Sequence, residues 1–341
     1  MQHGGMATVR DLARRLGCSA ATVSRALRQD PRLRPETVSR VMSCAAEFGF
    51  PERREGGTAT RLVLVLVRER GASPSLQSAE AIAGLRAAAR RDGVAVAQVQ
   101  EDLPEEGSWR PSPALGRILD DGRLAGIAVL GGLPTAIAGV LIRRAPLVTM
   151  GHDLALPGID AVQADHHRSA ETLVGHLRDL GHRRIGLVAN IADDAPNRDR
   201  VAGYHAALER WSLPHEDAQV VRFRGEDLDA VARYRLVEAA RKGVTAWLVA
   251  RNDGGAWAID VFREAGLRVP DDVSVAAFHR IGRLADGRRP TICPIAFERL
   301  GQELYGSLSD RWQGRSGGRR LLISCPLLVG ETTGPVPATL S

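Results

Sequence analysis

The sequence predicts an α/β protein in which a small helical domain precedes a larger, two-lobed core of parallel sheets covered by helices. Short amphipathic segments with helical periodicity fill residues 6–50. Beyond residue 62, apolar runs of strand length alternate with helical segments in two successive series. The chain has 341 residues, of which 44% are hydrophobic, so it can bury a large core. Two α/β series therefore predict two lobes that follow one small N-terminal domain.

The segment TVRDLARRLGCSAATVSRALR, residues 8–28, contains two predicted helices and the turn between them. Apolar residues recur in 9–16 at the i, i+3, i+4, i+7 spacing of an amphipathic helix. Gly17 supplies a tight stop, and the side chain of Ser19 can cap the second helix. A third helix is expected in residues 35–49. Short helices joined in this way predict a helix-turn-helix unit.

The exposed face of the second helix carries small residues and arginines, which suit the major groove of DNA. Alanine methyl groups can touch thymine methyls, and Arg25 can span O6 and N7 of guanine. Thr22, Ser24 and Arg28 are suited to phosphate oxygens. A three-helix packing module with a solvated arginine face is the alternative. The expected DNA-contacting residues are Thr8, Ser19, Ala20, Ala21, Thr22, Ser24, Arg25 and Arg28.

The positive charge is concentrated near the N-terminus. The formal net charge is +6, and residues 1–57 hold ten arginines against six acidic residues, which gives +4. A basic excess in the smallest domain suits a polyanion such as double-stranded DNA. No apolar run reaches the roughly 18 residues of a membrane span, and the N-terminal residues lack the apolar stretch of a signal peptide. We therefore expect a cytoplasmic protein without a membrane partner.

The core segments are assigned to strands and helices from their periodicity. The first series has expected strands at 61–67, 94–99, 126–130 and 146–150, and helices at 79–91, 113–120 and 134–143. The second series opens with a strand near Ala161, and its further strands are expected at 184–189, 219–223, 246–250 and 273–278. Its helices are expected at 169–180, 198–211, 228–242 and 254–265. Ligands of such folds bind at the carboxyl ends of the strands, here in the cleft between lobes.

Enzyme and metal-site motifs are absent from the sequence. It contains no GxSxG, no P-loop, no GxGxxG after a strand and no HExxH. His166, His167 and His176 lack diagnostic metal spacing, so surface or helix-capping positions are expected for them. Asp193 and Asp194 are expected in a solvated turn. The four cysteines are scattered and are expected to be reduced thiols. We expect no enzyme, no cofactor and no metal site.

Ordered matches to one protein family run along nearly the whole chain. TVRDLARRLGCSAATVSRALR and RPETVSRVMSCAAEFGF resemble the headpiece of the lactose-repressor (LacI) family of bacterial transcription regulators. DAVQADHHRSAETLVGHLRDLGHRRIGLVA, RVAGYHAAL, ARNDGGAWAIDVFREAGLRVPDDVSVAAF and PLLVGETT are similar to segments of that family's core. The resemblance implies a repressor that binds a pseudo-palindromic operator as a homodimer, under the control of a small molecule. A solute-binding receptor with a vestigial headpiece is the alternative, and the missing signal peptide opposes it.

The resemblance also implies a periplasmic-binding-protein-like core in which the chain crosses between lobes three times. The crossings are expected near Ala164, near Ile292–Cys293 and near Ser324. The implied domains are a helix-turn-helix headpiece (6–50), a linker (51–61) and an effector-binding and dimerisation core (62–335). Within the core, the N-lobe comprises 62–164 and 293–323, and the C-lobe comprises 165–292 and 324–335.

The linker PERREGGTATR, residues 51–61, departs from the family pattern. Family members continue into a short hinge helix whose leucine wedges into the minor groove. This linker is several residues shorter, contains Gly56 and Gly57, and has no leucine. Each glycine costs about 1 kcal/mol in a helix, and so short a helix is marginal by itself. We expect no hinge helix of the usual kind.

The resemblance assigns the effector to a cleft, and several residues that line this cleft differ from those of sugar-binding family members. Arg200 and Asn252 match family residues that face the effector, where a guanidinium and an amide can grip polar ligand groups. Gly151 stands where sugar-binding members carry an aspartate, and His279 and Arg280 replace two aspartates. The cleft thus loses hydrogen-bond acceptors and gains donors, which favours an acidic effector such as a sugar acid or sugar phosphate. The alternatives are that His279 and Arg280 face solvent, or that no natural effector exists. The loop RERGASPSL, which differs from the family pattern, contributes Ser73. The expected effector-binding residues are therefore Ser73, Arg200, Asn252 and His279.

Overall fold

The computed structural model describes most of the core and part of the N-terminal domain. The described residues are 9–27, 33, 36–38, 40–41, 44, 60–68, 75–104, 109–151, 157–190, 195–223, 229–250, 255–278 and 282–337. Predictions for the following residues lie outside these ranges: Thr8, Arg28, linker residues 51–59, Ser73, Asp193, Asp194, Asn252, His279 and Arg280. Among the described helices, none is long and apolar enough to cross a membrane.

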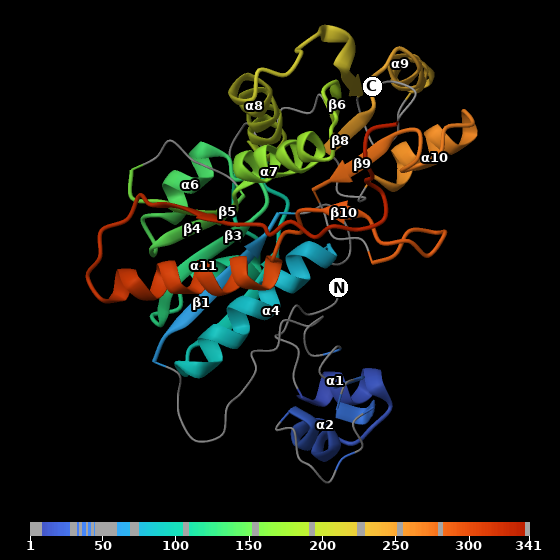
Figure 1. Ribbon diagram of the computed structural model, residues 1–341. Helices are drawn as coiled ribbons and strands as arrows, with labels where there is room; N and C mark the ends of the chain where they lie inside the picture. The colour runs from blue at the N-terminus through green and yellow to red at the C-terminus, as the bar shows by residue number, and fades with distance from the viewer. Residues whose placement is uncertain are drawn as a thin grey trace. The chain divides into compact units, whose positions relative to one another are not determined.

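The N-terminal domain contains the two helices that the sequence predicts. They are α1 (Val9–Leu16) and α2 (Ala20–Leu27), drawn in blue in Figure 1. Residues 36–38, 40–41 and 44 are also helical, within the segment expected to form a third helix. The side chains buried between these segments are those of Leu12, Ala13, Val23, Ala26, Val41 and Cys44. The apolar stripes of short helices therefore pack into one small core.

The turn between α1 and α2 is built from local hydrogen bonds. Gly17 has a φ of 63°, a left-handed conformation that favours glycine at the end of a helix. The N–H of Cys18 donates to the carbonyl of Ala13 at 3.0 Å. The Oγ of Ser19 accepts from the N–H of Thr22 at 3.0 Å, which confirms the predicted cap of α2.

The chain folds into two compact units, and each consists of two stretches of sequence. The first unit comprises Met1–Val162 and Phe297–Leu321, and the second comprises Gln163–Ala296 and Leu322–Ser341. The chain thus passes between the units three times, near the crossings that the family resemblance implies.

The first unit contains a six-stranded sheet with the order β11-β5-β4-β3-β1-β2. Its strands are β1 (Leu62–Val67), β2 (Ala95–Gln100), β3 (Leu124–Leu130), β4 (Leu147–Met150), β5 (Asp160–Ala164) and β11 (Arg320–Ile323). β1 pairs in parallel with β2 and β3, and β3–β4 and β4–β5 are parallel as well. The strand near Ala161 therefore belongs to the first sheet, in agreement with the expected N-lobe bounds of 62–164, whereas counting it as the first strand of the second series is wrong. Its pairing with β4 depends on contacts that local periodicity does not encode.

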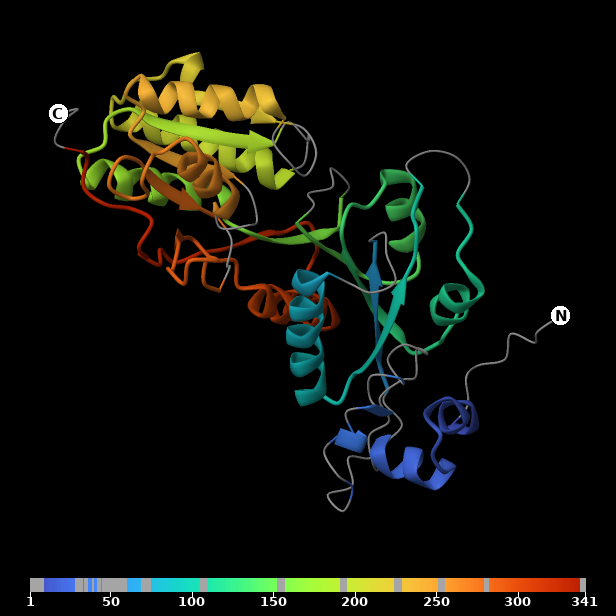
Figure 2. The same cartoon turned by 90° about the vertical axis from the view of Figure 1, so that its right-hand side faces the viewer.

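Helices cover both faces of this sheet. α4 (Leu76–Arg91) and α11 (Phe297–Trp312) lie on one face, and α5 (Pro113–Leu119) and α6 (Thr135–Leu141) lie on the other (Figure 2). The sequence-based assignment did not include α11 or β11. α11 lies in the second stretch of the first unit and β11 spans the end of that stretch, and together they complete the sheet and one helical layer.

Glycines let α4 and α11 approach until their backbones touch. A Cβ atom on Gly301 would lie 1.8 Å from the carbonyl oxygen of Ala81. A Cβ atom on Gly84 would lie 1.9 Å from the carbonyl oxygen of Glu298. Real Cβ atoms do not come that close to a backbone oxygen, so only glycine fits at either position of this crossing.

We expect Gly301→Ala to lower the free energy of unfolding by about 1–3 kcal/mol, because the helices must separate to admit one methyl group. The matched control is Gly306→Ala in the same helix, where the nearest atom to the added Cβ is a flexible Glu303 oxygen at 3.9 Å. That change should be neutral or stabilising, since alanine favours helix more than glycine does. Urea denaturation of both variants measures the difference, and equal destabilisation would contradict the close crossing.

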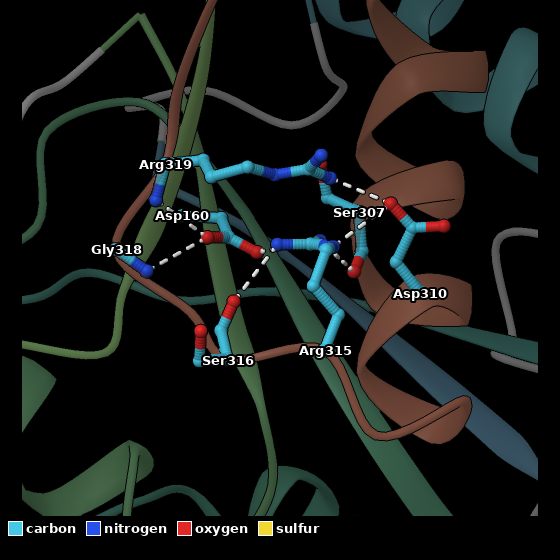
Figure 3. A network of polar contacts seen from close by, with 7 residues as sticks. All are labelled: Asp160, Ser307, Asp310, Arg315, Ser316, Gly318 and Arg319. Atoms are coloured by element: carbon cyan, nitrogen blue, oxygen red, sulfur yellow. Dashed lines mark hydrogen bonds and ion pairs between the residues drawn. The ribbon is translucent and has the colours of Figure 1, made fainter.

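A buried carboxylate fastens the turn between α11 and β11 to β5 (Figure 3). Asp160 is 2% exposed, and its Oδ1 accepts from the N–H groups of Gly318 at 2.9 Å and Arg319 at 2.8 Å. Its Oδ2 accepts from the guanidinium of Arg315 at 3.3 Å. The same guanidinium also donates to the carboxylate of Asp310 and to the carbonyls of Ser307 and Ser316. The turn is therefore held by charge-assisted hydrogen bonds from both backbone and side chain.

The second unit contains a five-stranded sheet with the order β10-β9-β8-β6-β7. Its strands are β6 (Ile185–Asn190), β7 (Val220–Phe223), β8 (Ala246–Ala250), β9 (Ser274–Ala277) and β10 (Thr291–Ile292), and neighbouring strands in this order are parallel. α7 (His166–Asp179) and α8 (Ala195–Arg210) pack on one face of this sheet, and α9 (Ala230–Arg241) and α10 (Ala256–Glu264) pack on the other. A 3-10 turn (Asp217–Gln219) precedes β7. The predicted alternation of strand and helix is confirmed here, except that β10 was not expected.

Candidate DNA-binding and effector sites

The exposed side of α2 presents the small residues and the arginine that the sequence selects for DNA contact. Ala20, Ala21 and Arg25 are exposed, whereas Val23 and Ala26 are buried in the domain core. One turn separates Ala21 from Arg25, so the two lie on the same side of the helix. A helix with short side chains at its start and an arginine one turn later can enter a major groove closely and still reach a base edge.

Hydroxyl groups at the start of α2 are already engaged with each other. The Oγ of Ser19 lies 2.7 Å from the Oγ1 of Thr22, in addition to accepting from that residue's N–H. Ser24 is half-buried on the flank of the helix. These hydroxyls retain lone pairs and rotatable protons, so phosphate contacts from them are compatible with the cap. The DNA-contacting roles of all eight predicted residues stay predictions.

Among the predicted effector residues, Arg200 is the one that the described ranges include. It lies on α8 and is 4% exposed. Its Nε donates to Nδ1 of His166 at 3.3 Å, and its Cζ lies 4.9 Å from the ring centroid of Phe278. A guanidinium over an aromatic face gains a cation–π interaction, which is stronger when water is excluded. Arg200 is therefore held on two sides by the second unit itself.

A close helix crossing brings Arg200 and His166 together. His166 is the first residue of α7, directly after Asp165, whose carboxylate caps that helix by accepting from the N–H of Arg168 at 2.9 Å. Gly203 lies one turn after Arg200, and a Cβ atom there would stand 2.3 Å from the carbonyl oxygen of His167. The glycine therefore lets α8 lie against the first turn of α7.

The position of His166 differs from the surface or helix-capping position that the sequence predicts. The residue is 6% exposed and Asp165 caps the helix, so the prediction is wrong for His166, whereas His167 is exposed as expected. Burial, reinforced by the positive charge of Arg200, lowers the pKa of His166 to about 3. The imidazole is therefore neutral at pH 7, and accepting a hydrogen bond at Nδ1 leaves its proton on Nε2. Its closeness to the arginine depends on Gly203, which stands three residues after Arg200 in RVAGY.

Metal and thiol chemistry receive no support from the described residues. In those ranges, no group of three or more His, Cys, Asp or Glu side chains is placed to hold a metal ion. Cys18, Cys44, Cys293 and Cys325 form no disulfide, in line with the expected free thiols. Burial raises the pKa of the Cys293 thiol to about 12, which keeps it protonated and unreactive.

Two parts of the chain match known protein families. Residues 8–51 match the family described as bacterial regulatory proteins, lacI family, and residues 174–333 match a periplasmic binding protein-like domain. The transcriptional repressor PurR of Photobacterium profundum is 25% identical over 334 residues, which cover 95% of this chain and 97% of PurR. The transcriptional repressor CytR of Escherichia coli K12 is 26% identical over 348 residues, which cover 97% of each chain.

Solved structures show the same fold. The transcriptional regulator CelR in complex with cellobiose has a TM-score of 0.66 and 23% identity, with 95% of this chain and 99% of that chain covered. The lac repressor dimer bound to operator and an anti-inducer has a TM-score of 0.62 and 23% identity, with 96% and 99% covered.

Together, these features define a protein that joins a helix-turn-helix DNA-binding domain to a periplasmic-binding-protein-like core. The chain belongs to the lacI family of bacterial regulatory proteins and is a DNA-binding transcriptional regulator. The resemblance found in the sequence is thereby confirmed, as is the predicted fold class.

Proposed function

We propose that the chain is a cytoplasmic repressor that binds a pseudo-palindromic operator as a homodimer and catalyses no reaction. The observation that carries this proposal is the face of α2, where Ala20, Ala21 and Arg25 are exposed beside a capped first turn. One small domain offers few base contacts, so two copies on a symmetric site are needed for useful specificity. The relatives are named as repressors, which supports the same sign of control here.

Selection from a random oligonucleotide pool tests this function. We expect the full chain to enrich one short inverted repeat and to prefer it over random DNA by at least about 1,000-fold at physiological salt. Binding should weaken steeply as salt is raised, because phosphate contacts release counterions. The matched control is the Arg25→Ala chain, which should enrich the repeat poorly while keeping salt-dependent binding to random DNA. A pool that yields no enriched inverted repeat would refute the repressor function.

We propose further that the effector is acidic, a sugar acid or a sugar phosphate, bound with Arg200, Asn252, His279 and Ser73. The support is the buried guanidinium of Arg200, because an oxyanion that loses its hydration is best compensated by charge-assisted donors. The replacement of two family aspartates by His279 and Arg280 points to the same class of ligand. The effector acts by binding one conformation of the repressor more tightly than another.

A further inference from the structure

We propose that the edge of the first sheet at which its strands begin is a second DNA-binding surface, where arginine side chains contact backbone phosphates of duplex DNA. This surface, the arginine edge, consists of the described residues 60–61, 88–94, 116–123, 138–146, 157–160 and 309–320. They form the last turns of α4, α5, α6 and α11 and the segments that lead into the strands. The inference rests on the proposed function, which assigns DNA to the chain as its ligand.

The positive charge of the core is concentrated at the arginine edge. It contains eleven arginines and five aspartates, which gives +6. Residues 1–57 carry +4 and the whole chain carries +6, so all remaining residues together carry −4. At the opposite edge of this sheet, the described residues of the first unit that follow the strands or begin the helices balance in charge: Arg68, Arg110, Arg299, Glu101, Asp102 and Glu298. The positive charge is therefore localised, which suits a polyanionic ligand.

The strand order arranges these arginines in a row. The order is β11-β5-β4-β3-β1-β2, and arginines lie before or at the start of every strand except β5. Neighbouring strands lie about 4.8 Å apart, so the six strand starts span about 24 Å. Over that length a duplex carries about 14 phosphate charges on its two strands. Nine of the eleven arginines are exposed, so the row can face such a duplex.

Local structure accounts for part of this charge. Four helices end at the arginine edge, and their carboxyl ends carry roughly half a negative charge each, which leaves about +4. The ion pairs at the surface do not fix their arginines firmly. Arg144 contacts Asp120 at 2.8 Å, with side chains that are 50% and 69% exposed. Such pairs contribute little to stability, so a DNA phosphate can replace the carboxylate at small cost.

The linker joins the core within this row. Its last residue, Arg61, directly precedes β1, and the Cζ of Arg61 lies 4.9 Å from the ring centroid of Trp312 at the end of α11. Eleven residues span at most about 40 Å even when fully extended. The arginine edge is therefore tethered close to any DNA that the DNA-binding domain holds. A tethered contact forms at high effective concentration, so even weak phosphate contacts add to affinity.

A triple substitution, Arg61→Gln, Arg91→Gln and Arg143→Gln, removes three exposed charges from the arginine edge. The matched control, Arg210→Gln, Arg222→Gln and Arg235→Gln, removes three exposed charges from the second unit. Fluorescence anisotropy would measure binding of each full chain to a random-sequence duplex of about 40 base pairs, which spans a double-helix length greater than that of the row. Urea denaturation of both variants should give the wild-type midpoint, because surface substitutions rarely alter stability.

We expect the edge variant to bind random DNA at least about tenfold more weakly than the wild type at physiological salt. The slope of log K against log salt should fall by about 2–3 per bound chain, because each lost phosphate contact removes roughly 0.9. The control should stay within about twofold of the wild type, since its positions lie outside the contact. On an operator, the edge variant should keep the wild-type base preferences, because phosphate contacts carry no sequence information.

The arginine edge and the repressor function fail in different ways. Equal losses from both triple variants would mean that net charge alone acts, and no loss from the edge variant would mean that the edge does not touch DNA. Either result overturns the arginine edge and leaves the repressor function, which depends on enrichment of an inverted repeat. If random DNA responds as expected but no repeat is enriched, the arginine edge stands and the repressor function is wrong. A wild-type chain that binds no DNA overturns both.

Discussion

Asp160→Ala is expected to lower the free energy of unfolding of the first unit by about 2–4 kcal/mol, because it removes a buried carboxylate that accepts three hydrogen bonds. The backbone N–H groups of Gly318 and Arg319 lose their acceptor in the protein. Arg315 keeps its contacts with Asp310 and two carbonyl groups, so its charge stays partly compensated. Urea denaturation measures the total loss, and hydrogen exchange of β5 and β11 locates it.

The matched control for Asp160 is an ion pair on the surface of the same unit. Asp121 contacts Arg123 at 2.7 Å, and both side chains are partly exposed. Water and salt screen such a pair, so Asp121→Ala should cost no more than about 1 kcal/mol. If the two substitutions destabilise equally, the buried network of Figure 3 contributes no more than a surface contact.

Arg25→Ala is expected to weaken operator binding by about 1–3 kcal/mol and to relax the base preference at one position of each half-site. The reason is that an exposed arginine one turn into α2 can donate two hydrogen bonds to guanine in the major groove. Competition binding of operators with every base at each position measures the change. The loss should be large for the operator and small for random DNA.

Arg28→Ala serves as the comparison for Arg25→Ala, because the sequence assigns Arg28 to phosphate rather than to a base. Its loss should weaken binding to all sequences alike and should reduce the salt dependence. If both substitutions give the same sequence-independent loss, Arg25 is a phosphate contact and the base preference must come from other residues.

Local sequence signals were sufficient for the described helices of the DNA-binding domain and for most described core elements. The glycine after α1 and the serine before α2 encode a stop and a cap that depend on neighbouring residues only, and both are found as predicted. Helix starts differ from the predicted ones where a side-chain cap lies before the periodic apolar residues. α4 begins at Leu76 rather than at 79, because the side chain of Ser75 accepts from the N–H of Ser78.

The elements that the sequence analysis missed are those defined by distant partners. α11 has apolar residues at Leu300, Leu304 and Leu308, and this i, i+4 pattern is typical of a buried helix face. β11 and β10 are short and gain their identity from pairing or bridging with remote segments. The strand near Ala161 was predicted, but it was counted with the second series because its pairing with β4 is also a distant contact.

In the candidate effector site, too, the sequence predicts a single residue but not the distant residues that contact it. Arg200 could be named from its family segment, but its partners could not. His166 lies 34 residues earlier in the chain, and the two meet only because Gly203 lets two helices touch. The sequence shows a histidine after an aspartate, which is equally typical of an exposed helix start. Only the tertiary packing reveals that the ring is buried against a guanidinium.

The first unit is built from two separate stretches of the sequence, and this arrangement determines the order in which the chain can fold during synthesis. α4 ends at Arg91, and its packing partner α11 begins only at Phe297. At about 5–20 residues per second, a ribosome needs on the order of 10–40 s to make the intervening segment. Through that interval the apolar face of α4 has no helix to cover it, while most of the second unit is already complete. This exposure of the α4 face ends when α11 emerges and packs against it.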